Sequence, residues 1–192
     1  MNPYRWWWRT GVALAAAMVV AAALLAGAWR PLAGSAAGSV TGSVADRDPP
    51  RCPQGETIAI LHSPHVSQAR AATVRYNSVP PTSGPHFAFT VAPGVYRSPV
   101  PDGLTVHALE HGHVAVQYAT GTPAATVRQL EGLVRDYAGG VVLAPYLALP
   151  RGVALTSWGC LRILEQYDEW AVRDFIERNR GRYDHGWRSG GR

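Results

Sequence analysis

The feature that most constrains this chain is an uncharged apolar run of 20 residues near its N-terminus, TGVALAAAMVVAAALLAGAW at residues 10–29. As an α-helix it would be about 30 Å long, enough to cross the hydrocarbon core of a bilayer. Arg5 and Arg9 precede the run with three tryptophans between them, which is typical of the cytoplasmic end of a transmembrane helix. We therefore predict a cytoplasmic N-terminus at residues 1–9, a transmembrane helix at residues 10–29 and export of everything that follows.

Two alternatives exist for this apolar run. A cleaved signal peptide is one, because Ala26, Gly27 and Ala28 fit a small-residue cleavage site. A buried core helix is the other, and the all-round apolar composition without a polar stripe argues against it. The anchor and the signal peptide export the same domain. The expected location is therefore the cell membrane, in a single-pass arrangement with the C-terminal domain outside the cytoplasm.

Export changes how the two cysteines, Cys52 and Cys160, are interpreted. In an oxidising compartment an isolated pair more often forms a disulfide than a reactive thiol. Closing a loop of about 100 residues would stabilise the fold by up to about 4.7 kcal/mol on the chain-entropy model. We predict a disulfide between Cys52 and Cys160, and the alternative is two separate buried thiols.

Composition excludes several functional classes. The chain has 18 arginines and no lysine, so it lacks the amine of a Schiff-base enzyme or a P-loop. Two cysteines are too few for a four-cysteine zinc or iron–sulfur site. Three of the arginines flank the apolar run (Arg5, Arg9 and Arg30), so residues 31–192 keep 15 arginines against 13 acidic residues, a net charge of +2 rather than +5. A nucleic-acid partner is therefore not expected.

The exported part divides into a linker, a domain and a tail. Residues 30–50 are rich in Gly, Ser, Ala and Pro and predict a flexible linker, residues 51–182 suffice for one domain with one core, and residues 183–192 form a basic tail. Strands are expected at residues 57–61, 113–118, 141–144 and 153–158. One helix is expected at residues 123–138, with Thr122 as its N-cap, and a second from Asp168 to about residue 181. This order predicts an α+β fold in which two packed helices cover a small, mostly antiparallel sheet; a split βαβ arrangement stays open.

Residues 76–112 differ from the rest of the domain because they hold six prolines and four glycines. That is too many for regular elements, and long irregular segments inside a compact domain are usually functional. His86 closes the sequence PPTSGPH, in which the prolines restrict φ and Gly84 permits a tight turn. We therefore expect a long Pro-rich loop that holds the His86 imidazole with little conformational freedom.

Histidines concentrate in and around this loop. His107 and His111 are four residues apart with Glu110 beside them, so a helical turn would place both rings on one face, whereas an extended segment would align His111 with His113. Neutral imidazole is the commonest side-chain ligand of zinc and copper, and a carboxylate serves as a ligand or fixes a tautomer. We predict a divalent metal site, copper or zinc, with the donors His65, His86, His107, His111 and Glu110.

Other functions compete with metal binding. The histidines could be a hydrogen-bonded cluster that holds the Pro-rich loop as an interaction surface, which would make the domain a structural module of the cell envelope. A metal-assisted hydrolase would use Glu110 as its base, and a metal-free enzyme would use Ser83 as its nucleophile, although no G-x-S-x-G sequence surrounds Ser83. The sequence indicates the membrane as a partner through residues 10–29, and it indicates no protein partner.

Three stretches resemble a bacterial family known as domain of unknown function 3105: YNSVPPTSGPH (76–86), GVY (94–96) and VHALEHGHV (106–114). The stretch LTSWGCL (155–161) and the closing helix are similar to the C-terminal part of that family, so the likeness covers about residues 55–182. The matching positions are His65, Tyr76, Asn77, Pro80, Pro81, Thr82, Ser83, Gly84, Pro85, His86, His107, Glu110, His111, Gly112 and Trp158.

The chain departs from the family pattern at a few positions. His62 and His113 fall outside it, Phe87 stands where a tryptophan is common, and residues 184–185 replace the usual Pro-Glu ending. The resemblance implies a membrane-anchored or secreted domain and assigns it no activity.

Overall fold

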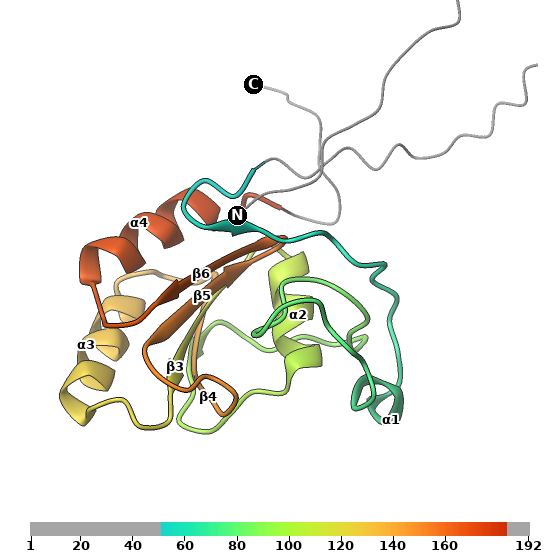
Figure 1. Ribbon diagram of the computed structural model, residues 1–192, viewed down its shortest axis with the longest axis horizontal. Coiled ribbons are helices and arrows are strands. Elements are labelled where there is room, and N and C mark those ends of the chain that lie inside the picture. Colours follow the sequence, from blue (N-terminus) through green and yellow to red (C-terminus); the bar gives the residue numbers. More distant parts are fainter. Residues whose placement is uncertain (1–50, 184–192) are drawn as a thin grey trace, which may run out of the picture. The chain divides into compact units, whose positions relative to one another are not determined.

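Six strands form one mixed β-sheet in the computed structural model, which describes residues 51–183 (Figure 1). The strands are β1 (Glu56–Thr57), β2 (Gly94–Val95), β3 (Val114–Ala119), β4 (Val141–Tyr146), β5 (Val153–Ser157) and β6 (Cys160–Leu164), in the spatial order β1-β6-β5-β3-β4-β2. Strands β1, β6, β5 and β3 pair antiparallel, whereas β3, β4 and β2 run parallel. A helical crossover from β3 to β4 makes these two strands parallel neighbours. The α+β class is confirmed, and the sheet is mixed.

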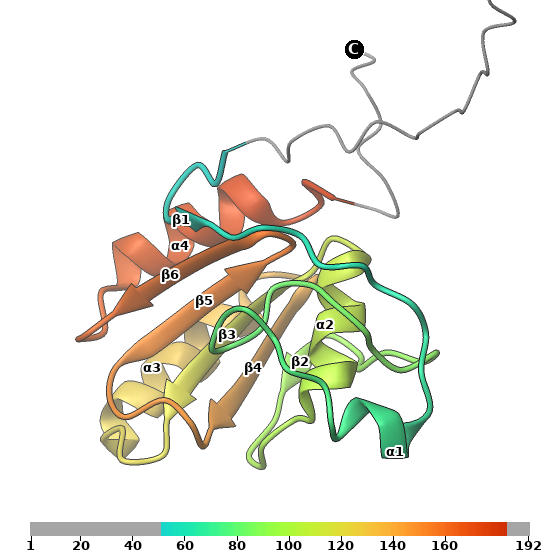
Figure 2. The same ribbon diagram turned by 45° about the vertical axis from the view of Figure 1, so that its right-hand side comes forward.

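Four helices accompany this sheet in the described part of the chain: α1 (Gln68–Ala71), α2 (Asp102–Glu110), α3 (Ala124–Arg135) and α4 (Glu169–Asn179). Helices α3 and α4 lie on one side of the sheet and contact each other, and α2 lies on the other side (Figure 2). The two packed helices expected from the sequence are α3 and α4. Helix α2 confirms the helical alternative for the segment that carries His107 and Glu110. The expectation that residues 76–112 hold no regular element is wrong, because β2 and α2 both lie in this range.

The ends of α3 and α4 test the capping predictions. Asp168 caps α4 as expected, because its Oδ1 accepts a hydrogen bond of 3.0 Å from the backbone N–H of Ala171. The N-cap prediction for α3 is wrong by one residue: Pro123 occupies the N-cap position, and no side chain caps the helix. Helix α3 also ends at Arg135, three residues early, because the chain turns through Gly139 and Gly140, both at positive φ.

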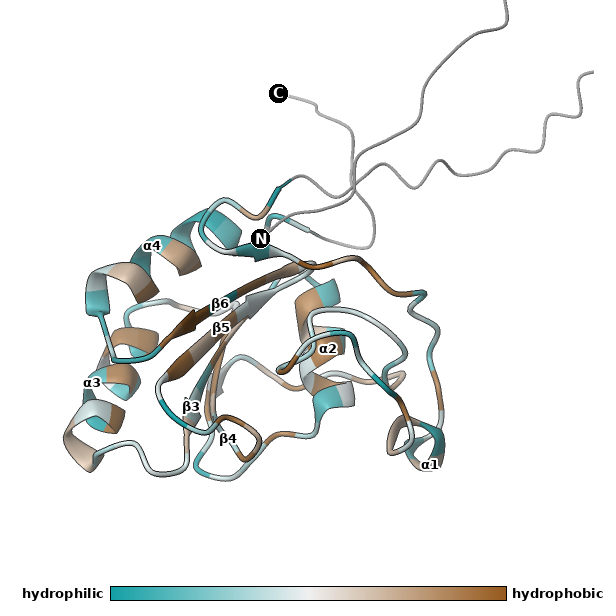
Figure 3. Cartoon of the chain, in the orientation of Figure 1, coloured by the Kyte–Doolittle hydropathy of each residue, from teal (hydrophilic) through white to brown (hydrophobic). Residues whose placement is uncertain are grey.

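Strand β3 separates two hydrophobic clusters because its side chains alternate between the faces of the sheet. Val116 belongs to the larger cluster with Leu130 of α3 and Phe175 of α4. Ala115 belongs to the smaller cluster with Leu109 of α2. Figure 3 shows hydrophobic residues along β5 and β6 and a mixture of hydrophobic and hydrophilic residues along α4. The smaller cluster supports the helix that carries the candidate site.

The strand expected at residues 57–61 is wrong beyond its first residue, because β1 ends at Thr57. The Leu61 N–H donates to Ser83 Oγ at 3.0 Å, and the Ala59 carbonyl accepts from Asn77 Nδ2 at 2.7 Å. These bonds attach the segment to the Pro-rich loop instead of the sheet. Strand β6 was not expected; it forms because Gly159, at φ +67°, reverses the chain after β5.

The predicted disulfide between Cys52 and Cys160 is confirmed, and it joins positions 108 residues apart. Cys160 on β6 is fully buried, so the bond ties the start of the domain to the sheet. Among residues 51–183, no helix is long and apolar enough to span a membrane. The transmembrane helix expected at residues 10–29, the linker and most of the basic tail lie outside the described residues.

Candidate metal centre

The Pro-rich loop presents His86 to the protein interior, where its side chain has no exposed surface. Its Nδ1 lies 2.8 Å from the carbonyl oxygen of Gly84. A carbonyl oxygen only accepts hydrogen bonds, so Nδ1 donates, and a neutral ring then carries its lone pair on Nε2. This buried Nε2 has no hydrogen-bond partner among the described residues. The loop therefore holds His86 Nε2 in the interior, at a place where it could serve as a metal ligand.

His65 reaches the same place from the segment before α1. The Val66 N–H donates to the His86 carbonyl at 2.8 Å, and the His86 N–H donates to the Pro64 carbonyl at 3.2 Å, which forms a short parallel bridge. The bridge brings the two rings together edge to face, with centroids 5.1 Å apart. His65 is exposed, so it forms the solvent side of the cluster.

Helix α2 supplies His107 and Glu110, which lie three residues apart and hence on one face. The His107 Nδ1 lies 2.7 Å from the carbonyl oxygen of Phe87, so it donates and leaves the lone pair on Nε2, as in His86. The Phe87 N–H in turn donates to the Gly103 carbonyl at 3.2 Å. The Pro-rich loop and α2 thus lock each other's orientation.

One donor atom from each of four residues gathers in a single group: His65, His86, His107 and Glu110 lie within 4.8 Å of one another. In a tetrahedral site with bonds of about 2.1 Å, the ligand atoms lie about 3.4 Å from one another. The more distant pairs of this group would therefore have to close by up to about 1.4 Å to bind one ion. The four residues come from three separate segments, which only the fold brings together.

The contact between His86 and Glu110 is the most informative one in the group. His86 Nε2 lies 3.2 Å from Glu110 Oε2, and the exposed fractions of the two side chains are 0% and 12%. With Nδ1 donating to a carbonyl, a neutral His86 directs a lone pair at a carboxylate oxygen. Two acceptors at this distance repel unless a proton or a metal cation lies between them.

The other histidines among residues 51–183 lie outside this group. His111 is exposed at the C-cap of α2, with its Nε2 at 2.9 Å from His107 Nε2 and its ring stacked on that of His107. His62 is exposed, and His113 has a buried Nδ1 with no partner in residues 51–183. Of the five predicted donors, four are thus brought together, and the fifth contacts one of them.

Burial lowers the pKa of His107 below its ordinary value, and the rings of His86, His111 and His65 lower it further, although the hydrogen bond to Phe87 opposes them. A neutral imidazole is the form that binds a metal. The surroundings of His107 therefore favour the state in which it can act as a ligand.

Several supporting residues carried no sequence signal beyond their place in the family motif. The Tyr76 hydroxyl donates to the Pro85 carbonyl at 2.8 Å, and burial, followed by the charge of Asp102, raises the pKa of Tyr76 to about 12, so it stays a donor. Gly112 has φ +80°, and a Cβ there would collide with the carbonyl oxygen of Tyr183. Tyr183 also stacks on Trp158, with ring centroids 5.0 Å apart. These contacts depend on segments distant in sequence, so no local pattern could predict them.

Ser83 is not placed as a nucleophile. Its side chain is fully buried, and its Oγ accepts the hydrogen bond from the Leu61 N–H. A nucleophilic hydroxyl has to reach both a base and a substrate. The metal-free enzyme alternative therefore finds no support in this geometry.

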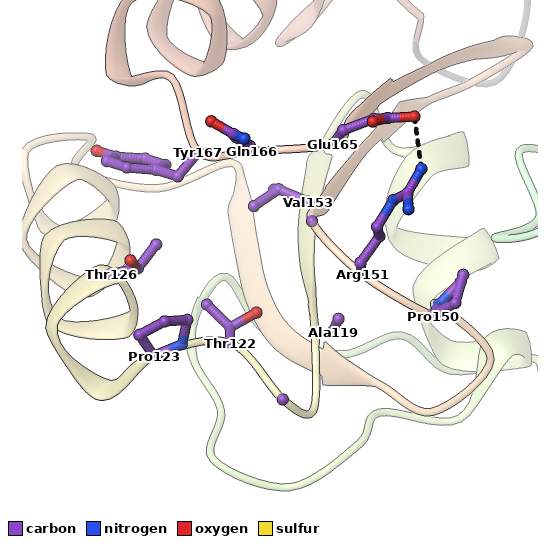
Figure 4. A pocket seen from close by; sticks show the side chains of 12 residues that line it. Ala119, Thr122, Pro123, Thr126, Pro150, Arg151, Val153, Glu165, Gln166 and Tyr167 are labelled. Carbon is purple, nitrogen blue, oxygen red and sulfur yellow. Dashed lines mark hydrogen bonds and ion pairs between the residues drawn. The ribbon is translucent and has the colours of Figure 1, made fainter.

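A pocket of about 340 Å³ lies elsewhere, between the β3–α3, β4–β5 and β6–α4 connections (Figure 4). Arg151 and Glu165 form an ion pair of 2.9 Å at its side. None of its lining residues belongs to the histidine group. The pocket is therefore not part of the candidate metal centre.

Comparison with known protein families identifies the class of this protein. A family model described as a protein of unknown function, DUF3105, matches residues 65–188, a range that contains all four clustered donors. The chain belongs to that family, as its motifs indicated. Comparisons with curated proteins and with solved structures found no match. The family assigns no activity, so function has to be argued from the site.

Proposed function

We propose that this protein binds one divalent metal ion, copper or zinc, through His65, His86, His107 and Glu110. The observation that carries the proposal is the gathering of four donor atoms in one group, in which His86 Nε2 lies 3.2 Å from Glu110 Oε2. A bound cation would take both of these atoms as ligands, together with Nε2 of His107. Three imidazoles and a carboxylate are a donor set that suits zinc and copper(II).

The same donor set argues against softer ions. Copper(I) prefers thiolate and thioether ligands. Both cysteines are joined in the disulfide, and the two methionines, Met1 and Met18, precede the domain. The site therefore offers only nitrogen and oxygen donors, which favours divalent copper or zinc.

The proposal places this site outside the cytoplasm, held at the membrane by residues 10–29. The charge pattern around the apolar run supports export of the domain. The disulfide supports the same location, because such bonds persist in oxidising compartments.

Metal content of the purified full-length chain tests the proposal. After removal of metal with a chelator and equilibrium dialysis against Zn²⁺ or Cu²⁺, we expect one equivalent bound to the wild-type protein. His65→Ala and Glu110→Gln should each weaken binding by more than about tenfold, since even partners outside the coordination sphere contribute that much. His62→Ala is the matched control, because His62 is exposed and lies outside the group. A wild-type protein that binds no metal, or variants that bind as tightly as wild type, would refute the assignment.

A further inference from the structure

Residues 62–76 form a strap at the edge of the domain. Neither this strap nor the residues next to it, from 59 to 79, contain a buried side chain. The strap carries α1, which lies apart from the sheet in both views (Figures 1 and 2). A segment without buried side chains gains little from packing, and a helix of four residues is marginal by itself. The strap can therefore open locally without disturbing the hydrophobic core.

The strap is attached to the domain through the Pro-rich loop. Hydrogen bonds join four strap residues, Ser63, Pro64, Val66 and Tyr76, to three loop residues, Gly84, Pro85 and His86. The attached strap residues lie at the two ends of the strap, and α1 lies between them. His65 stands within the first attachment, beside the loop that carries His86.

His65 is the donor that the strap contributes to the candidate metal centre. His86 Nε2 and Glu110 Oε2 are 3.2 Å apart, close to the spacing of about 3.4 Å in a tetrahedral site. The wider spacings of the group, up to 4.8 Å, therefore involve His65 or His107. His107 is only 5% exposed, and its Nδ1 lies 2.7 Å from the Phe87 carbonyl oxygen, whereas His65 is exposed. His65 is therefore the donor with room to close the group around an ion.

Resting on the proposed function, we propose that the bound divalent ion clips the strap to the domain, so that metal binding controls the order of residues 62–76. Without the ion, opening the strap breaks a few hydrogen bonds and exposes no buried side chain. With the ion in place, opening also breaks its bond to His65. By linkage, the ion suppresses opening by the same factor by which His65 raises the affinity for the ion. Occupancy of a largely buried centre thus becomes a change at the surface of the protein.

Hydrogen–deuterium exchange of the full-length protein, measured by mass spectrometry with and without saturating Zn²⁺, tests this inference. In the wild-type protein we expect residues 62–76 to exchange at least about tenfold more slowly with Zn²⁺, matching the affinity that His65→Ala loses. The β4–β5 connection at residues 147–152, which is largely exposed and outside the group, should exchange equally in both states. In His65→Ala, at a Zn²⁺ concentration that saturates this variant, the slowing should disappear. His62→Ala is the matched control and should behave as the wild-type protein does.

A second pair of variants tests the strap without changing a donor. Ala69 is exposed in the interior of α1, where glycine disfavours the helix relative to alanine. If metal binding orders the strap, Ala69→Gly should lower the Zn²⁺ affinity by up to about fivefold. Ala125→Gly makes the same change at an exposed position of α3, on the other side of the sheet from α2, and should leave the affinity unchanged.

Two exchange results would overturn the inference. One is equal exchange of the strap with and without Zn²⁺ in a wild-type protein that holds one equivalent, and the other is a slowing that persists in zinc-loaded His65→Ala. If His65→Ala cannot be loaded, equal Zn²⁺ affinities of Ala69→Gly and Ala125→Gly would overturn it. In each of these cases the wild-type protein still binds metal, so the proposed function stands. A wild-type protein that binds no metal would remove the proposed function and this inference together.

Discussion

The turn before His86 gives the sharpest test of how the fold builds the site. Gly84 has φ +120°, a conformation that residues with a side chain rarely adopt. A Cβ at this position would lie 3.2 Å from Leu61 Cδ1 and from the Tyr76 ring, so two packed side chains would have to shift. Backbone strain of this kind costs about 1–3 kcal/mol. We expect Gly84→Ala to lower the free energy of unfolding by about that amount.

The same chain offers a matched control at Gly132. This residue lies inside α3, and a Cβ there would meet nothing within 4 Å. Alanine is the better helix former, so we expect Gly132→Ala to stabilise the protein by about 0.4–1 kcal/mol. Urea denaturation of both variants, followed by tryptophan fluorescence, compares one chemical change at two positions with opposite expected signs.

The variant Gly84→Ala also tests the metal site, because the Gly84 carbonyl accepts the hydrogen bond from His86 Nδ1. Alanine keeps this carbonyl, but the strained turn displaces it, and disturbing a partner that orients a ligand typically lowers metal affinity by about 10–100-fold. We expect weaker Zn²⁺ binding in Gly84→Ala and unchanged binding in Gly132→Ala, measured by competition with a chromophoric chelator. If the two variants unfold at the same urea concentration, or bind Zn²⁺ equally well, the reasoning about this turn is refuted.

Three further predictions concern the domain as a whole. Replacing Cys52 and Cys160 together by serine should lower the free energy of unfolding by up to about 4.8 kcal/mol, because the disulfide closes a loop of 108 residues. A urea midpoint equal to that of the oxidised wild-type protein would contradict this. Zn²⁺ at about 100 times its dissociation constant should stabilise the wild-type protein by about 2.7 kcal/mol and Glu110→Gln far less, as thermal unfolding would show; an equal shift in both would remove Glu110 from the site. Burial raises the pKa of Asp102 above its ordinary value, and the hydrogen bond with Tyr146 opposes this shift. Folding therefore disfavours the charged carboxylate. The stability that the protonated carboxyl group contributes is lost as pH rises through its folded pKa. Asp102→Asn should therefore gain stability relative to wild type at pH 7 and not at pH 3, and a gain confined to pH 3 would reverse the sign of this argument.

Local patterns predicted the elements whose stability is itself local. Helix α4 follows from Asp168 at its N-cap and from apolar residues at helical spacing, and both features are present in the structure. The ion pairs Glu169–Arg173 and Asp174–Arg178 also form along it, as their spacing of four residues indicates. Strand β6 and the short β1 were missed or misplaced, because their boundaries depend on Gly159 and on hydrogen bonds from the Pro-rich loop.

The sequence by itself determined the residue types of the site and the disulfide pair. In a chain with no lysine and only two cysteines, the sequence favoured histidine and glutamate as the residue types that carry any chemistry, and two cysteines leave a single possible pairing. Tertiary structure decided the arrangement of those donors. The parallel bridge between His65 and His86 and the Phe87 carbonyl that orients His107 depend on contacts between segments distant in sequence, whereas the Gly84 carbonyl that orients His86 is only two residues away. Such contacts leave no periodic signal, because they are made by backbone groups that every residue possesses.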